Sequence, residues 1–142
     1  MKLGLDIHGV ITKDPRIFSN ITYRLMKADK TNQVHILTGA RCTAGLMADL
    51  SKMNITWTHF FSITDYHRSI GTDIEYKDND RNSPIIDDYL WDKTKAMYCH
   101  NEKIDIHIDD STVYGEYFKP ISTKYVYYGD NLSDLFSIIA KF

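Results

Sequence analysis

Polar residues that could carry out chemistry accompany the ends of three short apolar runs in this chain. The apolar runs cover residues 1–7, 34–37 and 104–108. The polar residues at or just after their ends are Asp6, Thr38, Asp109 and Asp110. The carboxyl ends of parallel strands lie along one edge of a sheet, where open α/β sheets bind ligands. We therefore predict that these oxygen-bearing side chains meet at one site.

A helix-like segment between the second and third runs adds an ammonium group. Residues 88–99 carry Lys93 and Lys95, which lie sixteen and fourteen residues before Asp109. A carboxylate can attack a phosphoryl group, and a hard cation such as Mg²⁺ then has to bridge the two anions. A hydroxyl and an ammonium group can hold the phosphoryl oxygens as their charge grows. The order of carboxylate, hydroxyl, ammonium and carboxylate pair therefore predicts phosphoryl-transfer chemistry.

This order resembles the four motifs of the haloacid dehalogenase superfamily of phosphatases and phosphotransferases, and the resemblance covers nearly the whole chain. It implies that Asp6 is the nucleophile, that Thr38 binds phosphate and that Lys95 is the motif lysine. Lys95 is preferred because Lys95 and Cys99 reproduce a spacing found in similar proteins, and Lys93 stays open as the alternative. The activity implied is a Mg²⁺-dependent phosphatase that works through an aspartyl-phosphate.

The resemblance also implies which residues would bind the metal and the substrate. The metal ligands implied are Asp6, Asp109, Asp110 and the backbone carbonyl of His8. The substrate contacts are Thr38, Gly39, Lys95 and Arg41. The substrate would be a phosphomonoester whose identity the sequence leaves open, because a nucleotide, a sugar phosphate and a nucleic-acid end all fit.

The chain departs from that family at His8. Family phosphatases usually carry a second Asp two residues after the nucleophile, and this Asp acts as the acid and base. An imidazole can carry a proton near neutral pH, so His8 could take over this task. His8 could instead lend only its backbone carbonyl to the metal. A non-catalytic relative that binds a phosphorylated ligand or a protein is therefore the alternative to a phosphatase.

A receiver-like signalling domain is a third interpretation, since receivers also combine acidic residues, a threonine and a lysine around Mg²⁺. Receivers typically carry an acidic pair early in the chain, and a central phospho-acceptor follows it. In this chain the acidic pair, Asp109 and Asp110, comes last. The order of the residues therefore argues against a receiver.

Predicted strands and helices alternate along the chain. The strands cover residues 1–7, 33–37, 55–61, 104–108 and 123–128. One helix begins at Asp14 and Pro15. The other helices cover residues 42–53, 88–101 and 132–141, and Asp130 and Asn131 cap the last of these. Such alternation favours an α/β fold with a mainly parallel sheet and helices on both faces. The resemblance implies the three-layer, Rossmann-like fold of the superfamily in a single domain over residues 1–142.

Residues 62–87 are the exception, because this polar segment fits no helix of the core pattern. Residues 73–77 could pair with residues 84–86 as a hairpin, and this insertion could act as a small lid. In the superfamily that the chain resembles, substrate choice often comes from inserted cap segments. The interval between Asp6 and Thr38 is too short to hold such an insertion, so a minimal-cap or capless member is expected. An open site favours large substrates, or a second subunit as lid and hence a homo-oligomer. The polar candidates near its mouth are Arg41, His67 and Arg68.

The composition fits one compact enzyme domain. The chain has 142 residues, of which 43% are hydrophobic, and its formal net charge of −2 gives no basic surface for nucleic acid. Cys42 and Cys99 are too few for a disulfide framework and indicate a reducing compartment. No apolar run suits a signal peptide or a membrane span. We therefore expect a cytoplasmic protein whose partner is a phosphorylated substrate, with no membrane contact.

Overall fold

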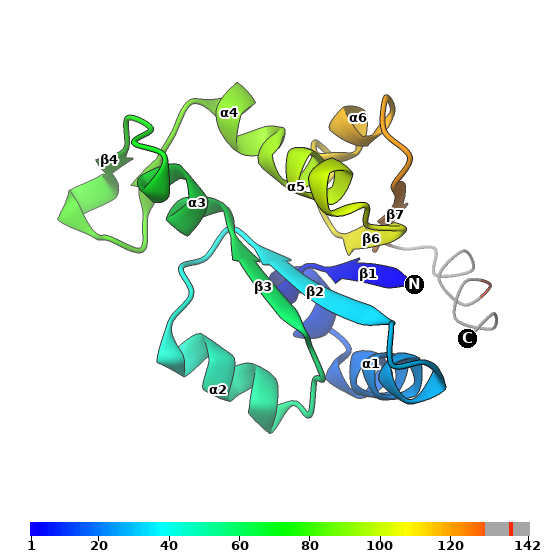
Figure 1. Cartoon of the computed structure of the whole chain (residues 1–142). Helices are drawn as coiled ribbons and strands as arrows, with labels where there is room; N and C mark the ends of the chain where they lie inside the picture. Colours follow the sequence, from blue (N-terminus) through cyan, green and yellow to red (C-terminus); the bar gives the residue numbers. More distant parts are fainter. Residues whose placement is uncertain (130–136, 138–142) are drawn as a thin grey trace.

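A parallel sheet forms the centre of the computed structural model, which describes residues 1–129 and residue 137. Its strands are β1 (Lys2–Leu5), β2 (Gln33–Thr38), β3 (His59–Ser62), β6 (Ile106–Asp109) and β7 (Lys124–Tyr127). They lie in the order β3-β2-β1-β6-β7, and every neighbouring pair is parallel (Figure 1). The prediction of an α/β fold with a parallel sheet is confirmed, and the arrangement is Rossmann-like.

The strand order reverses at β1. From β1 the chain moves outward to β2 and β3, and it then returns to place β6 on the other side of β1. Loops that leave two such strands diverge, and the crevice between their carboxyl ends is where open α/β sheets bind ligands. The loops after β1 and β6 hold Asp6 and Asp110, so the fold places both residues at this crevice.

Both faces of the sheet are covered by helices, as predicted (Figure 1). One face packs against α1 (Pro15–Ala28) and α2 (Ala44–Lys52), and the other against α5 (Thr94–Glu102) and α6 (Gly115–Phe118). The first apolar cluster includes Leu3, Leu5, Val34, Ile36, Ile106, Ile108, Phe18, Leu25 and Leu50. The second includes Leu37, Ala96, Cys99, Ile104 and Phe118. Side chains alternate between the two faces along each strand because the strand period is two residues.

The helix boundaries follow from local capping. Asp14 occupies the N-cap position of α1 as predicted, but its side chain caps no backbone N–H and accepts a hydrogen bond from the Tyr128 hydroxyl instead. Thr43 caps α2 by accepting a hydrogen bond from the Leu46 N–H at 3.1 Å. The prediction that this helix begins at Cys42 is therefore two residues early.

The prediction that residues 62–87 form no core helix is wrong. The structure has α3 (Ile63–Ser69), which Ser62 caps by accepting a hydrogen bond from the Asp65 N–H at 3.1 Å. The buried positions of α3 are Ile63, Thr64 and His67. Two of these are polar and are buried because they have hydrogen-bond partners, so an apolar pattern does not reveal them. The predicted hairpin is present as β4 (Glu75–Tyr76) and β5 (Pro84–Ile85), an antiparallel pair.

The helix predicted over residues 88–101 consists of two helices. These are α4 (Asp88–Asp92) and α5 (Thr94–Glu102), and Lys93 lies between them. The short helix α6 was not predicted. The helix predicted over residues 132–141 and its caps, Asp130 and Asn131, lie outside the described residues, residue 137 excepted. Among the described residues, no helix has both the length and the apolar character needed to cross a membrane.

Candidate active site

The turn after β1 fixes the position of Asp6. The Asp6 N–H donates a hydrogen bond of 3.0 Å to the carbonyl of Ile108, which ties this residue to β6. The chain then turns at Gly9, whose φ of 82° is a backbone conformation that favours glycine. The Gly9 N–H donates to the Thr12 hydroxyl at 3.1 Å. Asp6 is therefore bound through its backbone to β6 and is followed by a hydrogen-bonded turn. It is largely buried at the carboxyl edge of the sheet.

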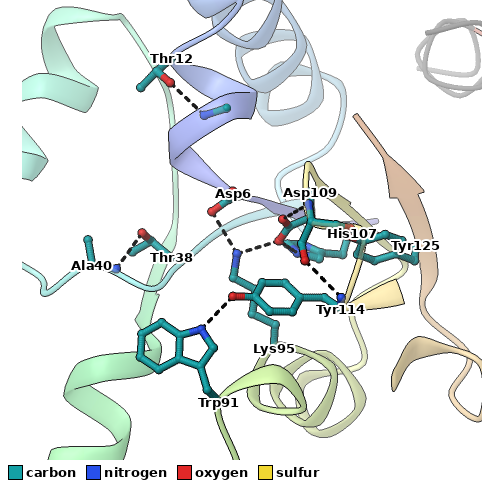
Figure 2. A network of polar contacts seen from close by, with 12 residues as sticks. Asp6, Thr12, Thr38, Ala40, Trp91, Lys95, His107, Asp109, Tyr114 and Tyr125 are labelled. Atoms are coloured by element: carbon teal, nitrogen blue, oxygen red, sulfur yellow. Dashed lines mark hydrogen bonds and ion pairs between the residues drawn. The ribbon is translucent and has the colours of Figure 1, made fainter. Parts of the chain in front are cut away.

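Lys95 connects the first and last predicted motifs. Its ammonium nitrogen lies 2.9 Å from Oδ1 of Asp6 and 2.7 Å from Oδ2 of Asp109, and the lysine is only 2% exposed (Figure 2). Lys93, the alternative, has its ammonium 4.5 Å from the centre of the Tyr89 ring. The structure therefore brings Lys95, and not Lys93, into contact with the carboxylates.

Asp109 is held by three donors. Its Oδ2 accepts from Lys95 and, at 2.8 Å, from Nε2 of His107, while its Oδ1 accepts from the Ser111 N–H at 3.0 Å. The sequence interpretation missed His107. One signal could have found it: His107 and Asp109 lie two residues apart in a strand and therefore point to the same face.

Three carboxylates converge at the site. One oxygen from each of Asp6, Asp109 and Asp110 lies within 4.8 Å of the others. Asp110 is exposed, and its side chain lies over the turn, because a Cβ added at Gly9 would be 1.9 Å from Oδ2 of Asp110. Such hard oxygen donors without thiolates or imidazoles suit Mg²⁺. The donor set present therefore fits the expected cation.

The two buried carboxylates have opposite electrostatic behaviour. Burial raises the pKa of Asp6 to about 7, and the neighbouring charge of Asp109 adds to the rise, although Lys95 opposes it. Burial alone would also raise the pKa of Asp109, but the hydrogen bond from His107 and the charge of Lys95 outweigh it and lower the pKa. Burial would lower the pKa of Lys95, and the charges of Asp6 and Asp109 raise it instead. Lys95 and Asp109 are therefore a charged pair in the folded protein.

The residues expected to bind substrate lie at the end of β2. Thr38 is buried, and its hydroxyl accepts a hydrogen bond from the Ala40 N–H at 3.1 Å (Figure 2). A Cβ at Gly39 would lie 2.8 Å from Cζ2 of Trp91, so this loop packs closely against α4. Arg41 is half-buried, and its Nε has no hydrogen-bond partner among the described residues. These residues share the edge of the sheet with Asp6, but within the described chain no hydrogen bond joins Thr38 to Asp6 or Lys95.

An aromatic pair shields Lys95 and was not anticipated from the sequence. The Trp91 Nε1–H donates to the Tyr114 hydroxyl at 2.8 Å, and the Tyr114 ring centre lies 5.3 Å from the Lys95 ammonium (Figure 2). A low-dielectric wall of this kind strengthens the interactions of the ammonium with anions. The pair therefore contributes to the electrostatics of the site.

Other predicted residues lie apart from the carboxylates. The placement of His67 at the mouth of the site is wrong, because His67 is buried and bonded to the hydroxyls of Thr72 and Thr94. Arg68 is exposed. His8 is also exposed, and its side chain has no hydrogen bond or ion pair within residues 1–129. The side chain of His8 thus stands outside the network around Lys95.

No family model matches this chain, and no curated protein matches its sequence.

Proposed function

We propose that this protein is a Mg²⁺-dependent phosphatase that hydrolyses phosphomonoesters through an aspartyl-phosphate on Asp6. The observation that carries the proposal is the meeting of Asp6, Asp109 and Asp110 with the buried Lys95 at the strand-order reversal. This arrangement agrees with the resemblance to the haloacid dehalogenase superfamily, whose three-layer fold is part of the same proposal.

Each residue of the site has its own role in the proposed hydrolysis. The Asp6 carboxylate attacks the phosphorus atom, the ester oxygen leaves with a proton as the alcohol, and an aspartyl-phosphate remains. Water then attacks that phosphorus, releasing inorganic phosphate and regenerating the Asp6 carboxylate. The Lys95 ammonium and the Thr38 hydroxyl hold the phosphoryl oxygens while negative charge accumulates on them. Gly39 and Arg41, in the loop after β2, complete the substrate contacts.

Asp6, Asp109, Asp110 and the backbone carbonyl of His8 would hold the metal. When bound, Mg²⁺ offsets the repulsion between the attacking carboxylate and the phosphoryl group. His8 is the proton carrier in this proposal, because it occupies the position of the acid–base residue, two residues after Asp6, and its side chain is exposed.

The same proposal extends to the cellular compartment of the protein and to the hairpin of β4 and β5. Cys42 and Cys99 are free, and free thiols suit the cytoplasm, where proteins are kept reduced.

The hairpin of β4 and β5 follows α3, which begins at the carboxyl end of β3 and thus at the edge that holds the site. We assign this hairpin the role of a small lid, which a second subunit could complement in a homo-oligomer.

Hydrolysis of a generic aryl phosphate, measured with Mg²⁺ and with a chelator, tests the proposal. We expect turnover that requires Mg²⁺ and that Asp6→Asn reduces by at least about 10⁴-fold, because this change removes the nucleophile at nearly constant volume. Asp49→Asn, an exposed change on α2, is the matched control and should keep wild-type turnover. Full activity of Asp6→Asn would overturn the mechanism.

A non-catalytic binding protein is the second candidate, and the histidine at position 8 is the observation that favours it. In that case the wild-type protein would hydrolyse no phosphomonoester in a panel of phosphorylated metabolites but would still bind one of them. Turnover of any member of the panel decides for the enzyme and identifies the substrate class.

A further inference from the structure

We propose that His107 is a positioning residue for Asp109, and that it turns one carboxylate oxygen of Asp109 toward the divalent cation. His107 would act in this way only if Asp109 binds Mg²⁺, so the role rests on the proposed function.

His107 is an unusual residue for its position. It lies in the middle of β6, between Ile106 and Ile108, and it is fully buried. Burying an imidazole is unfavourable unless its polar atoms find partners. The partner of Nε2 is Oδ2 of Asp109 at 2.8 Å. An ionised carboxylate can only accept hydrogen bonds, so Nε2 carries the proton and donates it.

The surroundings of His107 hold the ring in one orientation. Gly4 of β1 is its neighbour across the sheet, and a Cβ at Gly4 would lie 2.9 Å from Nδ1 of His107. The Phe118 ring is stacked on the imidazole, with centroids 5.5 Å apart and an angle of 14° between the planes. The glycine leaves room for the ring and the phenylalanine covers it, so His107 can direct Asp109 with little freedom.

The hydrogen bonds of Asp109 leave one oxygen open. Each carboxylate oxygen can accept about two hydrogen bonds. Among the described residues, Oδ2 receives two, from His107 and Lys95, whereas Oδ1 receives one, from the Ser111 N–H. The remaining acceptor position is on Oδ1. We therefore assign Oδ1 of Asp109 as the atom that binds the cation.

Lys95 alone could not maintain this orientation during a reaction. In the proposed mechanism its ammonium also holds phosphoryl oxygens, which compete with Oδ2 of Asp109 for the same N–H donors. Within residues 1–129 the N–H of His107 contacts only Asp109, so it continues to hold Oδ2 when Lys95 also binds the substrate. Residues that orient a metal ligand in this way typically contribute about 10- to 100-fold to metal affinity or activity.

The chain contains a matched control for His107. His35 of β2 lies on the other side of Gly4 in the sheet, and it is also fully buried. Its ring nitrogens bond to the Tyr98 hydroxyl at 2.8 Å and to the Gln33 amide oxygen at 2.9 Å, and not to a carboxylate of the site. A change at His35 therefore reproduces the loss of a buried histidine without touching Asp109.

Calorimetric titration with Mg²⁺ alone tests this role without measuring turnover. We expect His107→Leu to weaken Mg²⁺ binding by about 10- to 100-fold relative to wild type. His107→Gln should restore most of the affinity, because its amide N–H can reach Oδ2 from a similar distance. His35→Leu should bind Mg²⁺ like wild type, even though its free energy of unfolding is lower. Thermal unfolding without Mg²⁺ reports the purely structural cost of each change.

The outcomes separate this role from the proposed function. Wild-type Mg²⁺ affinity in His107→Leu would overturn the role of His107 and leave the phosphatase untouched. Mg²⁺ binding that depends on His107 in a protein without turnover would support the role and count against the enzyme. A wild-type protein that binds no Mg²⁺ would overturn both. If His107→Leu fails to fold, His107→Asn replaces it: its shorter amide cannot reach Oδ2, so wild-type affinity there would equally overturn the role.

Discussion

Asp6 and Asp109 show how two identical side chains in one site acquire different properties. Burial raises the pKa of Asp6 to about 7. Asp109 is buried even more completely, but His107 and Lys95 donate to it and lower its pKa. Asp109 stays ionised and its Oδ2 accepts two hydrogen bonds, so its Oδ1 is suited to hold a cation. The side chain of Asp6 accepts a hydrogen bond from Lys95 and faces the crevice, so it is suited to act as the nucleophile.

His8 is the residue at which activity can be tested most directly. If His8 carries the proton, His8→Ala should lower turnover by about 10²- to 10⁴-fold, the usual contribution of one acid–base group. His8→Asp should restore much of that loss and shift the limb of the pH–rate profile, because a carboxylate titrates at lower pH than an imidazole. An alanine variant with the wild-type rate and pH profile would show that His8 lends only its backbone.

Among the elements, the division between α4 and α5 decides which lysine enters the site. Lys93 lies at the junction, with its ammonium over the Tyr89 ring, and Lys95 lies in the first turn of α5, with its ammonium between Asp6 and Asp109. Residues two apart on helical turns point in different directions, so only one of the two lysines can face the sheet edge.

The two lysines give a paired prediction for this junction. Lys95→Met should lower turnover at saturating Mg²⁺ by about 10²- to 10³-fold, because it removes a preorganised positive charge from the phosphoryl oxygens. Lys93→Met should stay close to the wild-type rate. Steady-state kinetics on the aryl phosphate checks both variants, with thermal unfolding as a test of folding. The opposite pattern would make Lys93 the motif lysine.

The turn after β1 gives a second prediction at this scale. Gly9 and Gly71 both have positive φ, at 82° and 77°, but in the described part of the chain only Gly9 has a neighbour at its Cβ position, the carboxylate of Asp110. Alanine at either position should lower the free energy of unfolding by about 1–2 kcal/mol through backbone strain. Because the Asp110 side chain is exposed and can move, the added methyl group in Gly9→Ala displaces it at little further cost in stability.

Mg²⁺ binding distinguishes these two variants. The displaced carboxylate should weaken the Mg²⁺ affinity of Gly9→Ala by about tenfold, whereas Gly71→Ala should keep wild-type affinity. Chemical unfolding and Mg²⁺ calorimetry measure the two effects separately. Equal Mg²⁺ affinity in both variants would remove Asp110 from the metal site.

For the whole molecule, a histidine buried in the sheet links stability to pH. Burial lowers the pKa of His35 to about 4, and the nearby His59 and Lys2 contribute to the shift. The unfolded chain has an ordinary histidine pKa near 6.5. Between these values the unfolded chain binds a proton that the folded protein does not, so His35 destabilises the fold as pH falls from about 6.5 toward 4.

The free energy of unfolding should therefore fall with pH in this range, and His35 should account for up to about 3 kcal/mol of the fall. His35→Gln, which cannot titrate, should show a shallower decline between pH 7 and 4. Burial raises the pKa of Asp6, so Asp6 has the opposite effect, but both proteins contain it and the comparison cancels it. Urea unfolding at several pH values measures the difference, and parallel curves would exclude His35 as the cause.

The sequence by itself determined the class of fold and the edge of the sheet at which polar groups gather. Apolar runs of strand length that end at Asp6, Thr38 and Asp109 are local patterns, and a parallel sheet brings their ends together wherever the strands fall in its order. The hairpin around residues 75–85 was likewise predictable from its local turn and flanking strands. These features depend on residues that are neighbours in the chain.

Only the tertiary structure decided which side chains are partners. Lys95 and Asp6 are separated by 89 positions. The spacing of Lys95 and Cys99 favours Lys95 over Lys93 through a resemblance, but it does not show that Lys95 reaches both carboxylates. The buried His67 made α3 hard to recognise. The spacing of His107 and Asp109 indicates a shared face of the strand, but their burial and their hydrogen bond are visible only in the fold. A buried polar group is stable only through partners that packing supplies from distant segments. Its environment, and with it its pKa and chemistry, is therefore a property of the fold.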